Sequence, residues 1–286
     1  MGADRTYRGK GRRATGAPFV LACCIMPKRF LFLLAHPDDE TFGPGATIAK
    51  YSREGAEVHL ATATRGEAGM VGEPPLTDRE HLGEVREREL LAAAGILGIA
   101  KVHFLGFLDG QLSAAPRELL VERTVEVVRD VRPHVMVGFG PEGVSRHADH
   151  KVMCEVALSA FDRAADPGWY PGQLRDGVGT WAPLKLYQFE IAREFFEGWD
   201  APLAGVPRAK LSALVDTSAH VETKISAFSC HQTQMKDVRR ILGRPGYREF
   251  ARVETYVLAR TRLPGLRFPE EDLLAGVPEE PEEQGG

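Results

Sequence analysis

Between residues 29 and 164 the sequence alternates short apolar runs with longer segments of helical periodicity. Each apolar run is short enough to be a buried strand, and the apolar residues of the segment after it recur at helical spacing. Strands are predicted at 29–35, 57–64, 101–107 and 134–139, and helices at 44–54, 78–97, 116–129 and 149–164. Strands that alternate with helices predict an α/β fold, here Rossmann-like, with a mostly parallel sheet and helices on both of its faces.

The chain after residue 164 is less regular. A stretch rich in Gly, Pro and aromatic residues runs from about 169 to 207, with a strand predicted at 186–191 and a helix at 220–235. We interpret this part as a C-terminal elaboration of a single domain, 28–268, that walls the ligand site.

The two ends of the chain differ in composition from this domain. Residues 1–27 begin with a basic, Gly-rich stretch and are expected to form a disordered or dispensable extension. Residues 269–286 are rich in Glu and Pro and are expected to form an acidic, solvated tail.

Composition narrows the classes of partner. A net charge of −4 lacks the basic footprint of a nucleic-acid binder, so nucleic acid is not an expected partner. No apolar stretch approaches the ~20 residues that span a bilayer, so no membrane span is predicted. The four cysteines, which are scattered, do not make a disulfide framework and favour a cytoplasmic location; they are Cys23, Cys24, Cys154 and Cys230. The sequence leaves open whether the chain forms a homo-oligomer.

Two polar runs follow predicted strands of the sheet. Ala35-His36-Pro37-Asp38-Asp39-Glu40 follows the first strand, and His147-Ala148-Asp149-His150 follows the fourth. In open parallel sheets, ligands bind beyond the carboxyl ends of the strands, so the two runs are expected to meet. His36, Asp39 and His150 then form a His2Asp set with one open position, which is a typical ligand set of a catalytic Zn²⁺.

The remaining residues of the two runs suggest proton-transfer groups. Asp38 would lie beside the metal-bound water without being a ligand, which is the place for a general base. His147 would point toward the outer face of the site and could stabilise an oxyanion as a protonated imidazole, with Asp149 or another acid as its partner.

These runs, with Thr64-Arg65-Gly66-Glu67-Ala68-Gly69, resemble the motifs of the PIG-L/LmbE-like zinc-dependent de-N-acetylases, which remove acetyl from N-acetylglucosaminyl conjugates. Segments at 86–90, 97–99, 104–110 and 224–234 are also similar to family segments, and the resemblance covers roughly 28–258. It implies His36, Asp39 and His150 as zinc ligands. It also implies Asp38 as the base that later protonates the leaving amine, and His147 as oxyanion support with Asp149 behind it.

The resemblance also implies residues that contact the substrate. Arg65 would bind a phosphate or carboxylate, Asp109 would bind sugar hydroxyls, and His231 would reach the rim of the site. Structural alternatives stay open, since Arg65 could pair with Glu67 or a helix end and Asp109 could only shape the Asp-Gly turn. The sequence departs from some relatives before the second run, where Ser145 and Arg146 occupy a stretch that can hold a tyrosine.

The glycines of Gly138-Phe139-Gly140-Pro141-Glu142-Gly143 match a dinucleotide fingerprint, but they follow the fourth strand and precede no helix directly. They are expected to let the loop pass close to the metal. The predicted function is a zinc-dependent hydrolase that removes acetyl from an N-acetylglucosaminyl conjugate, a small-molecule partner. The alternatives are an amidase acting on a glucosaminyl thiol conjugate and a non-catalytic binding protein for the same conjugates.

Overall fold

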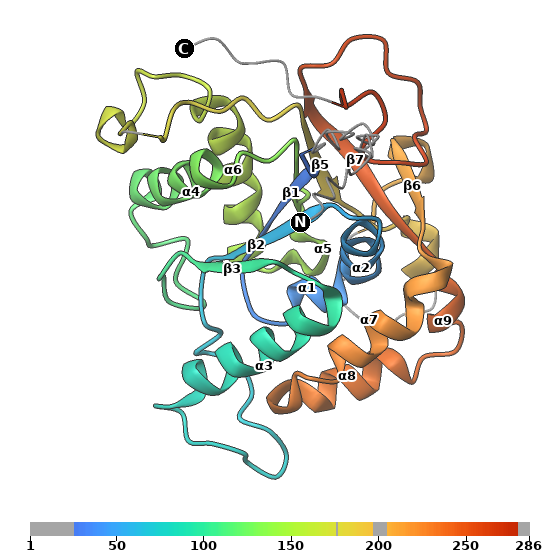
Figure 1. Ribbon diagram of the computed structural model, residues 1–286. Coiled ribbons are helices and arrows are strands. Elements are labelled where there is room, and N and C mark those ends of the chain that lie inside the picture. The colour runs from blue at the N-terminus through green and yellow to red at the C-terminus, as the bar shows by residue number, and fades with distance from the viewer. Residues whose placement is uncertain (1–25, 176, 197–204, 280–286) are drawn as a thin grey trace, which may run out of the picture.

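The computed structural model describes residues 26–175, 177–196 and 205–279, and its centre is a seven-stranded sheet (Figure 1). The order across the sheet is β3-β2-β1-β4-β5-β7-β6. The first five strands in this order are parallel, and β7 pairs antiparallel with both β5 and β6. The strands are β1 Arg29–Leu34, β2 Glu57–Thr62, β3 Lys101–Phe104, β4 Val135–Phe139, β5 Lys185–Phe189, β6 Ala213–Asp216 and β7 Val253–Thr261.

Helices cover both faces of the sheet. Figure 1 shows α4 and α6 together on one side, and α2, α3 and α7 together on the other. This arrangement confirms the predicted Rossmann-like α/β fold. The helices are α1 Asp39–Phe42, α2 Gly45–Arg53, α3 Leu82–Leu97, α4 Arg117–Val131, α5 Gly143–Arg146, α6 Ala148–Arg163, α7 Val221–Phe228, α8 Met235–Leu242 and α9 Tyr247–Phe250. In the part of the chain that the structure describes, no helix is both long and apolar enough to cross a bilayer.

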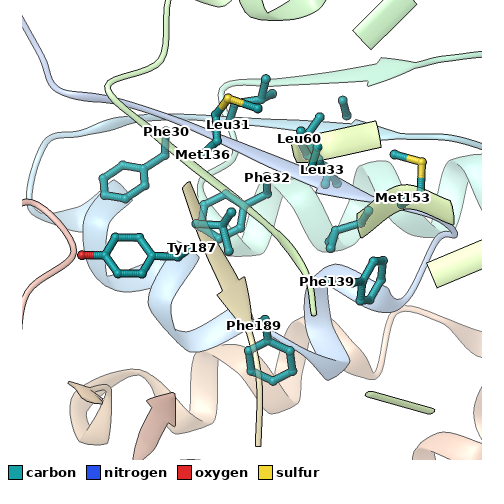
Figure 2. Close-up of a cluster of buried hydrophobic side chains, with 14 of the residues drawn as sticks. Phe30, Leu31, Phe32, Leu33, Leu60, Met136, Phe139, Met153, Tyr187 and Phe189 are labelled. Carbon is teal, nitrogen blue, oxygen red and sulfur yellow. The ribbon is translucent and has the colours of Figure 1, made fainter. Parts of the chain in front are cut away.

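The core lies around β1, the middle one of the five parallel strands. Figure 2 shows Phe30 and Phe32 on one side of this strand and Leu31 and Leu33 on the other, and all four side chains are fully buried. A parallel strand with helices on both faces buries every residue, which explains the continuous apolar run. Truncating one of its phenylalanines to alanine would cost about 3–5 kcal/mol of stability. The strand therefore holds the residues that follow it on a rigid base.

The predicted helix at 220–235 is broken in the structure. α7 ends at Phe228, a 3₁₀ turn spans Gln232–Gln234, and α8 begins at Met235. His231 has a non-helical backbone (ψ 68°), and its side chain turns inward to a buried carboxylate of another segment. The sequence did not reveal the break, because apolar periodicity continues on both sides of it and the residue that His231 contacts, Glu40, is 191 residues away in the chain.

The described part of the predicted solvated tail is mostly exposed, but two of its residues are buried. Glu270 is 5% exposed, its carboxylate lies 2.6 Å from the buried Lys185 Nζ, and Leu273 is fully buried. A lysine buried at the start of β5 needs a counter-charge, and the segment after residue 269 supplies it. Residues 280–286, and all but the last two residues of the predicted extension 1–27, lie outside the described part.

Candidate metal centre and its pocket

The two polar runs meet at the carboxyl edge of the sheet, where the strand order reverses. His36 and Asp39 follow β1, and His150 lies in the first turn of α6, just after β4. β1 and β4 are hydrogen-bonded parallel neighbours, so their carboxyl ends open on the same side. The expected meeting of the two runs is therefore confirmed, at the place where open α/β sheets bind ligands.

Donor atoms of three residues converge there, and both carboxylate oxygens of Asp39 take part in the contacts. His150 Nε2 lies 3.2 Å from both His36 Nδ1 and Asp39 Oδ1, and His36 Nδ1 lies 3.5 Å from Asp39 Oδ2. Tetrahedral Zn²⁺ with bonds of about 2.0–2.1 Å would separate its ligands by about 3.3–3.4 Å. All three residues are at most 7% exposed. The histidine nitrogens and the carboxylate are donors of the types that Zn²⁺ takes, and their spacings are close to the tetrahedral value.

Asp39 is prepared for this position by its backbone contacts. Its Oδ2 accepts hydrogen bonds from the backbone N–H groups of His36 (2.8 Å) and Ala35 (3.2 Å). Although burial raises the pKa of Asp39, the imidazoles of His150 and His36 hold it well below its ordinary value. The carboxylate is therefore ionised, as a metal ligand must be.

A second layer of acceptors orients the two histidines. His36 Nε2 donates toward Asp109 Oδ1 (3.0 Å) and Asp149 Oδ2 (3.3 Å), and His150 Nδ1 donates to the Gly143 carbonyl (3.0 Å). These contacts leave Nδ1 of His36 and Nε2 of His150 to face the metal position. Carboxylate and carbonyl partners of this kind fix the tautomer of metal-binding histidines.

The second layer corrects one sequence prediction. The side chain of Asp149 contacts His36 instead of His147, and its oxygens accept from the N–H groups of Gly110 (2.7 Å) and Leu112 (3.2 Å) in the loop after β3. Asp109, in the same loop, contacts His36 and accepts from the Ala68 N–H (3.1 Å). It also lines the pocket, so its contact with sugar hydroxyls stays a prediction.

The carboxylates make the centre strongly attractive to cations. Although burial lowers the pKa of His36, the surrounding carboxylates, Asp109 first, raise it well above its ordinary value. A cluster of negative charge that stabilises a proton on an imidazole also stabilises a metal cation.

Gly143 brings the loop after β4 close to His150. Its φ is 64°, and a Cβ built on it would lie 2.8 Å from the His150 Cβ. Val144 (φ 55°) and Arg146 (φ 61°) are also left-handed, which is a strained conformation costing about 1–3 kcal/mol for each residue. The expectation that these glycines let the loop approach the site is confirmed for Gly143.

Asp38 lies beside the metal position with its side chain 28% exposed to the pocket. Its backbone has a φ of 104°, which is unusual for a residue with a side chain. Partial burial raises the pKa of Asp38 to about 6, while the Arg86 guanidinium lowers it and the Asp39 carboxylate raises it further. A carboxylate with this pKa can accept a proton near neutral pH.

Arg86 is a site residue that the sequence reading did not single out. It is 3% exposed, and its guanidinium donates to the carbonyls of Gly66 (2.8 Å) and Pro37 and to Asp38 Oδ2 (3.0 Å). A Cβ on Gly66 or Gly69 would collide with this guanidinium. One signal was available: Arg86 falls on the apolar stripe of its helix, where a charged residue needs a buried partner.

His147 is exposed and lies near the metal position, its ring centroid 4.7 Å from that of His36. Its Nδ1 accepts the backbone N–H of Asp149 (3.2 Å) at the start of α6. Desolvation and the neighbouring His36 lower the pKa of His147, which favours its neutral form. With Nδ1 accepting, its proton lies on Nε2, which can still donate a hydrogen bond.

A pocket of about 660 Å³ opens above the centre. Its floor is formed by the residues just described, and the volume is that of a typical small-molecule site. One wall is the 68–70 segment with Arg79, and a second wall comes from the segment that runs from the end of α7 to just beyond α8. The two walls meet where Gln234 Nε2 donates to the Met70 carbonyl. The residues of the second wall are Phe228, Gln234, Asp237, Val238, Arg240, Ile241 and Arg244.

Two predicted substrate contacts are not found at the pocket. Arg65 pairs with Glu87 and lies over the Phe104 ring (5.2 Å), so the structural alternative holds, with a different partner from Glu67. The prediction that His231 reaches the rim is wrong, because its side chain is fully buried against Glu40.

Known proteins are similar to this chain in sequence and in fold. The PIG-L family, described as GlcNAc-PI de-N-acetylase, matches residues 31–161. The 1D-myo-inositol 2-acetamido-2-deoxy-alpha-D-glucopyranoside deacetylase of Geodermatophilus obscurus is 34% identical over 297 residues, which cover 88% of this chain and 98% of that protein.

Two solved structures are similar in fold. The N,N'-diacetylchitobiose deacetylase of Pyrococcus horikoshii superposes with a TM-score of 0.64 at 20% identity, covering 81% of this chain and 83% of that one. A conserved protein of Thermus thermophilus superposes with a TM-score of 0.61 at 27% identity, covering 85% of this chain and 98% of that one. The family match spans both polar runs of the metal centre, and the chain belongs to the PIG-L family of de-N-acetylases.

Proposed function

We propose that this chain is a zinc-dependent hydrolase that removes the acetyl group from an N-acetylglucosaminyl conjugate. The observation that carries the proposal is the convergence of the buried side chains of His36, Asp39 and His150, whose donor atoms lie 3.2–3.5 Å apart. They lie on the floor of a pocket, with the Asp38 carboxyl beside them. This arrangement leaves room for a water and an acetamide at the open position.

Hydrolysis of the acetamide needs a group that polarises the carbonyl, a base that takes a proton from water and an acid that protonates the leaving nitrogen. A Zn²⁺ ion held by the three residues would supply Lewis acidity toward the acetyl carbonyl and toward water. Asp38 takes a proton from the attacking water, and it returns that proton to the nitrogen as the amide C–N bond breaks. The products are acetate and the free amine of the glucosaminyl conjugate.

Two further residues act on this step. His147 donates from Nε2 to the oxygen that gains negative charge, and it does so as a neutral imidazole. Arg86 holds the Asp38 carboxyl from the side through its 3.0 Å ion pair. Both groups are in place before substrate binds, so neither has to reorganise during the reaction.

The first substrate candidate is an N-acetylglucosaminyl inositol, because the Geodermatophilus obscurus relative is named as a deacetylase of that compound. The relatives' names favour deacetylation over the amidase and binding-protein alternatives. A cytoplasmic location is part of the proposal and is supported by the two described cysteines, Cys154 and Cys230, which are both free thiols.

The experiment compares the zinc-loaded protein with Asp38→Asn on N-acetylglucosaminyl inositol, measuring acetate release. The variant should keep one zinc per chain while turnover falls by about 10²–10⁴. Wild-type turnover in the variant would overturn the role of Asp38. Release of an acyl-cysteine product from a thiol conjugate, with no acetate from any N-acetylglucosaminyl conjugate, would favour the amidase alternative.

A further inference from the structure

Glu40 and His231 form a fully buried pair behind the catalytic floor. Both side chains are 0% exposed, and His231 Nε2 donates to Glu40 Oε1 at 2.7 Å. His231 Nδ1 has no hydrogen-bond partner within the described ranges of the chain. Among the described residues, Glu40 is the one hydrogen-bond partner of this imidazole, and neither residue lines the pocket.

The second oxygen of Glu40 reaches Asp38. Glu40 Oε2 accepts the backbone N–H of Asp38 at 2.9 Å. That N–H belongs to the residue with a φ of 104°, a conformation that costs free energy unless its surroundings impose it. The backbone of Asp38 sets the direction of its carboxyl, so this hydrogen bond acts on the orientation of the side chain.

His231 links this contact to the pocket wall. It lies between α7 and α8, and its neighbours are also anchored: the Thr233 N–H donates to Glu89 Oε1 (2.8 Å), and Gln234 Nε2 donates to the Met70 carbonyl (2.8 Å). Several hydrogen bonds therefore hold the turn between α7 and α8 against neighbouring segments. Of these, the His231 contact is the one that leads to Asp38.

A buried carboxylate and imidazole are costly to keep away from water. Replacing such a pair by apolar residues is often neutral or stabilising, so stability alone is a weak reason for its presence. The contact from Glu40 to the strained Asp38 supplies another reason.

We propose that Glu40 and His231 are positioning residues, which hold the Asp38 backbone so that its carboxyl faces the water position. This inference rests on the proposed role of Asp38 as general base. It assigns a role to Glu40, the last residue of the first polar run.

The test uses Glu40→Ala and Glu40→Gln in the full chain, each loaded with zinc. Alanine removes the acceptor for the Asp38 N–H, whereas glutamine keeps a side-chain carbonyl that can accept it. His231→Gln removes the imidazole but keeps a donor for Glu40. The matched control is Glu270→Ala, which removes a carboxylate from an equally buried pair with Lys185 that does not line the pocket.

For each variant, kcat, KM, zinc content and Tm are measured with the same substrate. Glu40→Ala should lose about 100-fold in kcat per bound zinc, with KM changed less than about twofold. Glu40→Gln should recover most of that loss. His231→Gln should fall between the two. Glu270→Ala should lower Tm and leave kcat unchanged.

Wild-type kcat per bound zinc in Glu40→Ala would overturn the inference, as would equal losses in Glu40→Ala and Glu270→Ala, which mark a purely structural role. If Glu40→Ala lowers zinc content but not kcat per bound zinc, the pair supports the metal site and the inference fails. A failure of the proposed function is separate, because it would show as full turnover in Asp38→Asn.

Discussion

The Nη2 atom of Arg86 lies 3.0 Å from Oδ2 of Asp38, so a buried guanidinium holds the carboxyl that faces the metal position. Arg86 comes from α3, whereas Asp38 follows β1. The contact joins two segments that are 48 residues apart in the chain. It sets both the direction of the carboxyl and its affinity for protons.

Replacing Arg86 by methionine should lower kcat/KM by about ten- to a hundredfold, because a charge-assisted hydrogen bond to Asp38 is lost. The guanidinium lowers the pKa of Asp38, so its removal raises that pKa. The acid limb of the pH profile should move to higher pH. Arg65→Met is the matched control, since Arg65 pairs with Glu87 outside the pocket, and an equal loss there would contradict the role of Arg86.

The activity of the wild-type enzyme should fall as pH drops through the pKa of Asp38, because a general base must be deprotonated. Burial raises the pKa of Asp38 to about 6, and a bound dication would lower it. The acid limb of kcat/KM is therefore expected at or below about pH 6. If the acid limb of kcat/KM lies above pH 7 and persists in Asp38→Asn, the titrating group is not Asp38.

Asp149→Asn should weaken zinc binding by about 10- to 100-fold, because the carboxylate that orients His36 loses its charge. Competition with a chelator measures the change. Glu155→Gln, on the exposed side of the same helix, is the control. Unchanged zinc affinity in Asp149→Asn would show that the contact between Asp149 and His36 does not support the metal.

Gly143→Ala should lower stability by about 1–3 kcal/mol and also weaken zinc binding, since its Cβ would press on His150. Gly265→Ala separates the two effects, because Gly265 has a similar φ (69°) and open space where the Cβ would lie. Denaturant unfolding and zinc competition are measured for both. If both variants keep wild-type zinc affinity, the close approach of Gly143 to His150 is unimportant for the metal.

The alternation of strands and helices was enough to predict the sheet, because apolar periodicity is a local property of the sequence. It also placed His36, Asp39 and His150 together, since the carboxyl ends of neighbouring parallel strands share one edge. The partners of those residues could not be predicted in the same way. Asp109 reaches His36 from the loop after β3 and Asp149 reaches it from the first turn of α6, and no spacing in the sequence encodes these contacts.

Arg86 and His231 illustrate the same limit. Each is a polar residue in an apolar-periodic segment, and each is buried against a carboxylate that is far away in sequence: Asp38 for Arg86, and Glu40 for His231. The pattern indicates that such a residue needs a partner, but only the tertiary structure identifies the partner. The buried contact of Glu270 with Lys185, in a segment whose composition is typical of a solvated tail, has the same origin.

The most direct test of the proposed function is a zinc titration of metal-free protein, with acetate release from N-acetylglucosaminyl inositol as the readout. We predict no release without zinc, a rise that saturates at one equivalent per chain, and no rise in His150→Ala. Full release by the metal-free protein, or a His150→Ala variant that binds zinc and releases acetate as the wild type does, would contradict it.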